Sequence, residues 1–103
     1  MVTIEKDTGD GFRFLLKSEA GQTLLRSICF PSEADANLSL QNLKQEKKFE
    51  RKTDHEGKFL FNLWDGQGRL LGQSERYSSE AGMENGIKNL QSRINLLPDK
   101  GFL

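Results

Sequence analysis

The hydrophobic and polar positions follow two periods in turn, first strict alternation and then a spacing of three or four residues. Three apolar side chains alternate with polar ones and share one face of a predicted strand: Phe12, Phe14 and Leu16. Turn-rich segments flank this strand, and a further strand is predicted from about residue 23 to residue 30. Ser32 then begins a helix as its N-cap. The apolar stripe of this helix has three residues at helical spacing: Ala36, Leu40 and Leu43.

The same pattern recurs further along the chain, with residues 1–44 corresponding to residues 48–91 without a gap. Ser79 is the predicted N-cap of the second helix. Its apolar stripe is again at helical spacing: Met83, Ile87, Leu90 and Ile94. Gly82 and Gly86 interrupt this helix and each cost about 1 kcal/mol relative to alanine. We expect the helix backbone to pack closely there, against the sheet or the other helix.

The repetition predicts the fold class and the division of the chain. One copy is too small to bury a core alone, so the two copies must share one. We predict an α+β fold, in which two tandem β-β-β-α repeats form one antiparallel sheet with both helices packed on one face. The chain is then a single domain over residues 1–103. Repeat 1 spans 1–46, repeat 2 spans 47–94, and 95–103 form a C-terminal tail.

The second copy also carries a motif that resembles a known family. The run Tyr-Ser-Ser-Glu-Ala-Gly begins at Tyr77, and Glu-Asn-Gly-Ile begins at Glu84. These runs resemble the YegP-like family of small bacterial proteins, while the first copy has Asp35 and Ser39 in place of the two glycines. The resemblance implies tandem repeats that form a single antiparallel sheet, with the C-terminal helices exchanged between repeats. It implies no activity, because this family is a domain of unknown function.

The charge balance argues against binding partners, such as nucleic acids, that are attracted by a strong net positive charge. The chain has 15 basic and 15 acidic residues, so its formal net charge is zero. No field steers it onto DNA, RNA or an anionic membrane. The N-terminal residues lack the apolar run of a signal peptide, and no segment approaches a membrane span. We expect a small, soluble, cytoplasmic protein.

The residues that usually carry chemistry are few. His55 is the single histidine and lies in a predicted turn, which excludes histidine triads and multi-histidine metal sites. Cys29 is the single cysteine and lies in an apolar strand, where a thiol usually behaves as a small hydrophobe. We predict no enzyme, no cofactor and no metal site.

A basic cluster offers one alternative function. Four cations fall within six residues: Lys47, Lys48, Arg51 and Lys52. With Phe49 and Phe59 nearby, residues 47–58 could form a weak nucleic-acid-binding surface. Acidic residues dilute this field, so a solvated linker and edge strand is the favoured interpretation, in which lysines discourage aggregation.

The sheet face opposite the helices is the favoured interaction surface. Strand alternation places several apolar side chains there: Leu15, Leu25, Leu60, Trp64 and Leu70. An exposed apolar cluster typically marks a binding surface. The face could instead be covered by the tail with Phe102 and Leu103, or by self-association. Our leading hypothesis is a non-enzymatic protein-interaction module that presents this face to a partner protein or to its own copy.

Overall fold

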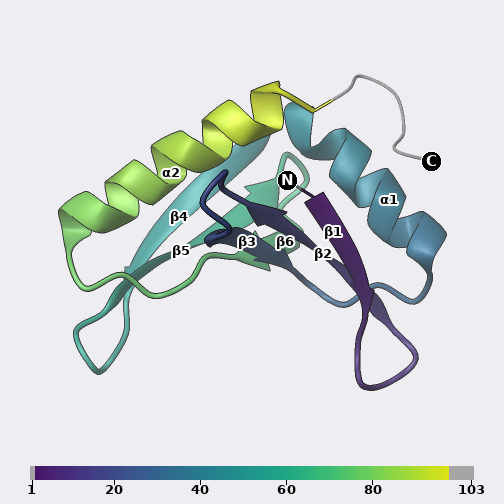
Figure 1. Cartoon of the computed structure of the whole chain (residues 1–103), viewed down its shortest axis with the longest axis horizontal. Coiled ribbons are helices and arrows are strands. Elements are labelled where there is room, and N and C mark those ends of the chain that lie inside the picture. The colour runs from purple at the N-terminus through teal and green to yellow at the C-terminus, as the bar shows by residue number, and fades with distance from the viewer. Residues whose placement is uncertain (1, 98–103) are drawn as a thin grey trace.

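The computed structural model describes residues 2–97, and in that range the strands form one continuous sheet (Figure 1). The elements in chain order are β1 (Val2–Lys6), β2 (Phe12–Lys17), β3 (Thr23–Ser27), α1 (Glu33–Gln41), the 3-10 turn η1 (Asn42–Lys44), β4 (Lys47–Thr53), β5 (Phe59–Asp65), β6 (Leu70–Gln73) and α2 (Glu80–Asn95). Each strand is antiparallel to its neighbours, in the order β1-β2-β3-β6-β5-β4. Strands β1 and β4 are therefore the sheet edges, and β3 pairs with β6 in the middle.

The α+β class is confirmed, but the prediction of two tandem β-β-β-α repeats is wrong. The structure is one six-stranded antiparallel sheet with two helices. The reason is the central pairing, in which Arg26 lies opposite Gln73 and Ser27 opposite Gly72. These pairs join all six strands into a single antiparallel sheet. The expected exchange of helices is also wrong for α1, which packs on β2, while α2 contacts both β3 and β5.

The predicted helix starts are confirmed by their capping bonds. The Ser32 hydroxyl accepts a hydrogen bond from the Asp35 backbone N–H at 3.1 Å, and Ser79 accepts one from the Gly82 N–H at 3.0 Å. Each bond satisfies one of the donors that a helix N-terminus leaves without an intrahelical partner. The helices differ in length, because α1 ends after nine residues and continues only as η1, whereas α2 has sixteen.

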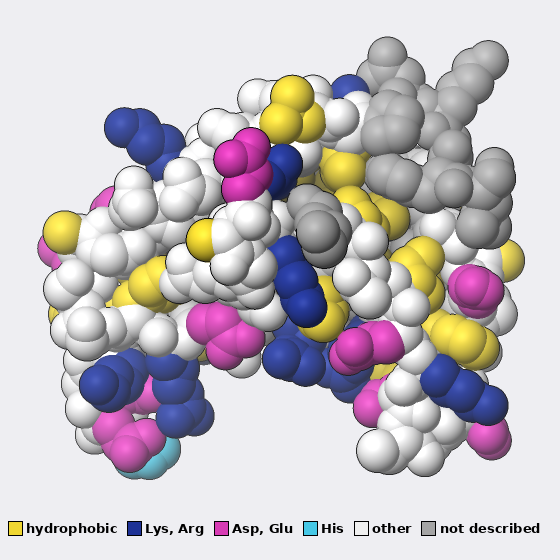
Figure 2. All heavy atoms as spheres, viewed as in Figure 1, with side chains coloured by type: hydrophobic (Ala, Val, Ile, Leu, Met, Phe, Trp, Pro, Cys, Tyr) yellow, Lys and Arg dark blue, Asp and Glu magenta, His cyan; other side chains and the backbone are white. Residues whose placement is uncertain are grey.

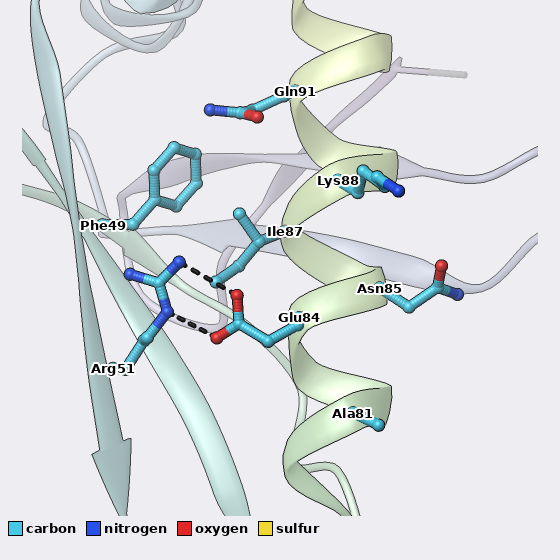
Figure 3. A pocket seen from close by; sticks show the side chains of 8 residues that line it. All are labelled: Phe49, Arg51, Ala81, Glu84, Asn85, Ile87, Lys88 and Gln91. Atoms are coloured by element: carbon cyan, nitrogen blue, oxygen red, sulfur yellow. Dashed lines mark hydrogen bonds and ion pairs between the residues drawn. The ribbon is translucent and has the colours of Figure 1, made fainter.

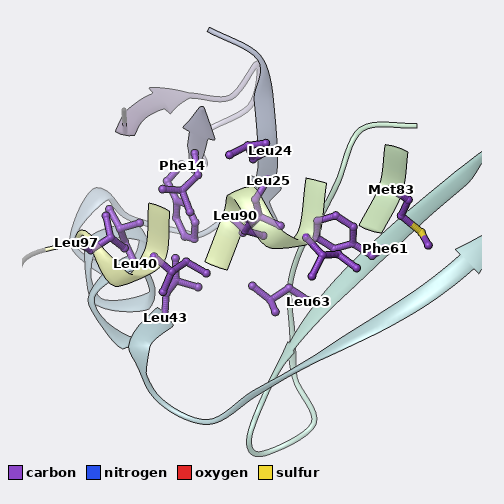
Figure 4. Packing of buried hydrophobic residues seen from close by; sticks show 13 residues of the cluster. Phe14, Leu24, Leu25, Leu40, Leu43, Phe61, Leu63, Met83, Leu90 and Leu97 are labelled. Atoms are coloured by element: carbon purple, nitrogen blue, oxygen red, sulfur yellow. The ribbon is translucent and has the colours of Figure 1, made fainter. Parts of the chain in front are cut away.

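The core lies between the helices and the sheet (Figure 4). Both predicted apolar stripes are confirmed as buried, from Ala36 to Leu43 and from Met83 to Ile94. Leu25 had been predicted on the opposite face, and that placement is wrong. The register between β2 and β3 shifts after Leu16, so Leu24 is a bulge residue and Leu25 lies opposite Leu16. Both leucines are in the core because a β-bulge changes which side the following residues face.

Two buried serines hold the strands together through their hydroxyl groups. The Ser27 hydroxyl accepts from the Phe14 N–H at 2.9 Å and donates to the Ile28 carbonyl at 2.7 Å. The Ser74 hydroxyl accepts from the Phe61 N–H at 2.9 Å and donates to the Glu75 carbonyl at 2.8 Å. The hydroxyls thus take the place of ladder bonds where the backbone pairing is interrupted.

Replacing Ser74 should therefore weaken the fold. In Ser74→Ala the buried N–H of Phe61 loses its acceptor, and we expect unfolding to become easier by about 1–2 kcal/mol. Urea denaturation followed by circular dichroism measures this change. The exposed Ser92→Ala serves as control, and equal stability of the two variants would contradict the role given to the Ser74 hydroxyl.

Candidate interaction face

The sheet face without helices lies over a hollow between the two ends of the molecule. Figure 1 shows α1 and α2 above the sheet, and the hairpin ends of β1–β2 and β4–β5 projecting away from them. Figure 2 shows the hollow between these projections, with Lys and Arg side chains gathered in its middle. We call the sheet surface opposite the helices the open face.

The strand registers define a row of side chains across the middle of the open face. Successive cross-strand partners form this row from β4 to β1: Glu50, Asn62, Gln73, Arg26, Leu15 and Thr3. Residues directly opposite each other on antiparallel strands point to the same side. Five of the six side chains are polar, and four of these, from Glu50 to Arg26, lie on adjacent strands.

Hydrogen bonds connect the polar part of this row and tie Trp64 to it. One oxygen of the Glu50 carboxylate, Oε1, accepts from the Trp64 indole N–H at 3.0 Å and from the Asn62 amide at 3.2 Å. The Asn62 Oδ1 accepts from the Gln73 amide at 2.9 Å. Arg26 lies 3.6 Å from the Glu75 carboxylate, and both side chains are about half exposed. These bonds fix the orientation of an aromatic ring within a polar surface.

The four predicted interaction residues differ in how much of each side chain is exposed. Leu15 and Leu60 are only 5% and 8% exposed, so they add little accessible apolar surface. Trp64 and Leu70 lie opposite each other on β5 and β6 and are half-buried. The open face therefore presents Trp64 and Leu70 beside polar groups. Phe102 and Leu103, which were considered as a cover for this face, lie outside the described residues.

The polar members of the face were not predicted. Glu50, Asn62, Gln73 and Arg26 carry no recognisable motif. Asn62 could have been found by the rule that predicted the apolar residues, because it lies between Leu60 and Trp64 in the alternation of β5. Glu50 would have required the register of β4 against β5, which sequence does not give.

The Glu50 carboxylate is sensitive to acid in a way that Trp64 can report. Hydrogen bonds from the Trp64 indole and the Asn62 amide hold the pKa of Glu50 below its ordinary value. A carboxyl whose pKa is lowered by folding stabilises the fold above its unfolded pKa. That contribution is lost as the pH falls through the folded pKa.

We therefore expect the fluorescence of Trp64, the single tryptophan, to change as the pH falls below the ordinary pKa of a glutamate carboxyl. Protonation of Glu50 removes the charged acceptor of the indole N–H, which alters the surroundings of the ring. Glu50→Gln, which cannot titrate, should lack this step. An identical acid transition in the wild type and Glu50→Gln would show that another group causes it.

The four residues of the predicted basic cluster do not form one surface. Strand alternation along β4 sends Lys47 and Arg51 to the helix side, whereas Lys48 and Lys52 lie on the open face on either side of Glu50. Arg51 is further engaged by a two-bond ion pair with Glu84 of α2, at 2.5 and 3.0 Å. Nucleic-acid binding by this cluster stays a prediction. Its four cations form two separate pairs on opposite sides of β4.

The candidate reactive residues lie apart from the open-face row. His55 is exposed in the β4–β5 hairpin. Cys29 is exposed near the β1–β2 hairpin, where desolvation and the neighbouring Asp7 carboxylate raise the pKa of its thiol. A raised pKa reduces the thiolate fraction and hence the nucleophilicity of the sulfur. Among residues 2–97, no three His, Cys, Asp or Glu side chains are grouped to hold a metal ion.

Within the same described range, no helix is long and apolar enough to span a membrane.

Comparison with known proteins reveals clear relatives. A family model described as "Domain of unknown function (DUF1508)" matches residues 54–94. The chain is 32% identical over 93 residues to the UPF0339 protein YegP of Shigella flexneri, and this match covers 86% of this chain and 84% of that relative. A UPF0339 protein from the ptx operon 5' region of Stutzerimonas stutzeri is 31% identical over 93 residues, with the same two shares covered.

Solved structures show the same likeness. The solution NMR structure of YegP from E. coli, a protein of unknown function, matches with a TM-score of 0.78 at 32% identity. That match covers 88% of this chain and 82% of the other. The solution NMR structure of a UPF0339 protein from Shewanella oneidensis matches with a TM-score of 0.73 at 27% identity, over 88% and 80% of the two chains. The similarity thus extends over most of each protein.

Proposed function

The chain belongs to the UPF0339 family of YegP-like proteins. Since the function of this family is unknown, we infer the role of the chain from the residues on its open face. The proposal is a non-enzymatic protein-interaction module that binds a partner protein on the open face. The observation that carries it is Trp64, an aromatic side chain that lies half-buried among polar groups and is held in place by Glu50.

The composition of the open face supports protein binding. Tryptophan and arginine are the residue types most enriched among those that dominate binding energy at protein interfaces. Trp64 and Arg26 lie on the same face, with the Asn62 and Gln73 amides between them. An indole that is already oriented loses little conformational freedom on binding, which favours affinity. The hollow below the sheet leaves room for a protruding partner segment (Figure 2).

The proposal predicts a large loss of binding when Trp64 is truncated. We expect Trp64→Ala to abolish capture of the partner from a host lysate, since removing a central aromatic anchor typically costs 2 kcal/mol or more, about 30-fold in affinity. Affinity capture with quantitative mass spectrometry, with and without nuclease, makes the measurement. Circular dichroism verifies that the variant is folded.

The matched control changes an exposed apolar residue on the helix side. Leu96 follows α2 and is 73% exposed, so Leu96→Ala removes apolar surface away from the open face. The proposal requires Leu96→Ala to capture the same proteins as the wild type. If Trp64→Ala also retained them, or if nuclease removed them, the open face would not be a protein-binding surface, and nucleic acid would become the better candidate.

A further inference from the structure

A second surface lies along the edge of the sheet, and its backbone is available for pairing. Strand β4 has seven residues and forms one edge of the sheet, and among residues 2–97 it pairs only with β5. Edge strands of this length expose a row of N–H and C=O groups on which another strand can form. Many proteins bind extended peptides by adding them to such an edge.

The hairpin fixes which backbone groups of β4 face outward. It closes with the Asp54 N–H donating to the Lys58 carbonyl at 2.9 Å. Because backbone bonding alternates along an antiparallel ladder, every second residue before Asp54 bonds to β5. The residues between them direct their N–H and C=O groups away from β5, to the open edge: Phe49, Arg51 and Thr53.

A groove runs beside this edge on the helix side. It has a volume of about 520 Å³ and lies between β4 and α2, as Figure 3 shows. Phe49 and Ile87 provide its apolar part, and Phe49 is anchored to the core by an edge-on contact with Phe61 at 5.6 Å between ring centroids. The Arg51–Glu84 ion pair crosses the groove and neutralises both charges. Alternate side chains of a strand added to β4 would face this groove.

The other side of β4 has the opposite character. Lys48 and Lys52 lie there, and within the described residues neither ammonium group forms an ion pair. The acidic residue between them is Glu50, whose carboxylate is turned toward β5 by its bonds from Trp64 and Asn62. The remaining side chains of an added strand would therefore meet two lysine side chains that have no close ion-pair partner in this part of the chain, although both charges act on Glu50 from a distance.

We propose that β4 binds an extended peptide segment in which acidic and apolar residues alternate, as an additional strand beside α2. Apolar side chains of the segment fill the groove at Phe49 and Ile87, its carboxylates face Lys48 and Lys52, and its backbone bonds to the outward groups of Phe49, Arg51 and Thr53. A second copy of the chain is a poorer occupant. Two-fold pairing of β4 centred on Glu50 or Lys52 places like charges opposite each other. Pairing centred on Arg51 places the two guanidinium groups opposite each other, although it also sets Glu50 opposite Lys52.

The test is an NMR titration with a defined probe, an acetylated and amidated hexapeptide of alternating aspartate and valine. We expect shifts and slower hydrogen exchange at the amides of Phe49, Arg51 and Thr53. The same peptide with lysine in place of aspartate should bind at least tenfold more weakly. No response to millimolar acidic peptide, equal binding of the lysine peptide, or shifts confined to Trp64 and Gln73 would overturn the proposal.

A proline variant tests the backbone bonds directly. Arg51→Pro and Arg51→Ala both remove the guanidinium group, but only proline also removes the outward N–H, a change that edge strands tolerate. We expect Arg51→Ala to bind the peptide and Arg51→Pro to bind it about tenfold more weakly. Equal binding by both folded variants would contradict strand addition.

Methylated peptides give the same test without altering the protein. In an added strand, only every second amide of the peptide points at β4. Methylation of one alternate set of peptide nitrogens should abolish binding, whereas methylation of the other set should leave it. Equal effects of the two sets would overturn the proposal. So would a wild-type dimer in sedimentation that Arg51→Pro dissociates, because β4 would then pair with a second copy.

Discussion

Gly72→Ala is expected to destabilise the protein by about 4 kcal/mol or more, a large part of the stability of a domain of this size. Gly72 lies opposite Ser27 in the central pairing of β6 with β3. A Cβ at position 72 would lie 2.6 Å from the Arg26 carbonyl oxygen and 3.0 Å from the Ser27 Cα. Both are backbone atoms, so the clash is relieved only by moving β3 away from β6. Thermal and urea denaturation measure the loss.

Gly9→Ala is the matched control for this substitution. Gly9 lies in the β1–β2 hairpin, and a Cβ there would have no atom within 4 Å. We expect its stability to stay within about 0.5 kcal/mol of the wild type. If Gly72→Ala were as stable as Gly9→Ala, the close approach of β3 and β6 would be wrong, and with it the single continuous sheet.

Gly86→Ala is expected to destabilise the protein by about 2–3 kcal/mol, the upper range for over-packing. Alanine favours an isolated helix over glycine by about 1 kcal/mol. In this fold, however, a Cβ at position 86 would lie 2.3 Å from the Tyr77 hydroxyl oxygen and 2.6 Å from its Cζ. Tyr77 packs against the core, and its hydroxyl is buried with no hydrogen-bond partner among the described residues. The Tyr77 ring, or the helix backbone beside it, therefore has to shift, and urea denaturation measures the resulting loss of stability.

Gly82→Ala, one turn earlier on α2, separates packing from helix propensity. Its Cβ would lie 3.7 Å from the Tyr77 ring, an ordinary contact, and 3.1 Å from the Ser79 hydroxyl. We expect the stability of Gly82→Ala to lie within about 1 kcal/mol of the wild type. A Gly86→Ala variant as stable as Gly82→Ala would show that Tyr77 does not require the glycine at position 86.

These two glycines illustrate what the sequence could and could not predict. The spacing of Gly82 and Gly86 indicated a close approach to the helix, but the expected neighbour was the sheet or the other helix. The neighbour is Tyr77, from the segment between β6 and α2. The pattern gave no information about Gly72, since only the assembled strand order places it against β3.

Local features were predictable because they depend on nearby residues. Helix caps at Ser32 and Ser79 and the buried helix stripes follow from short-range spacing, and all are present. Features that depend on register were not. Leu25 faces the core because of a bulge, and the strand order β1-β2-β3-β6-β5-β4 depends on the pairing of β3 with β6. The open face was predicted as apolar, whereas Glu50 and Asn62 make it polar around Trp64.

The open face and the sheet edge formed by β4 are adjacent but distinct surfaces. Lys48 of β4 lies opposite Trp64 of β5, so a partner on the open face would extend toward the edge. The two surfaces use different chemistry, however. The open face offers oriented side chains around Trp64, whereas the edge offers backbone groups at Phe49, Arg51 and Thr53. Variants of Trp64 and proline variants of β4 therefore separate them.

The most direct test of the proposed function is photo-crosslinking in living cells from single positions of the intact chain. A benzophenone amino acid would be placed at Trp64 or Gln73 on the open face, and at Leu96 on the helix side as control. We expect a discrete protein adduct from Trp64 and Gln73 and none from Leu96. Adducts from Leu96 alone, or none from either open-face position, would contradict it.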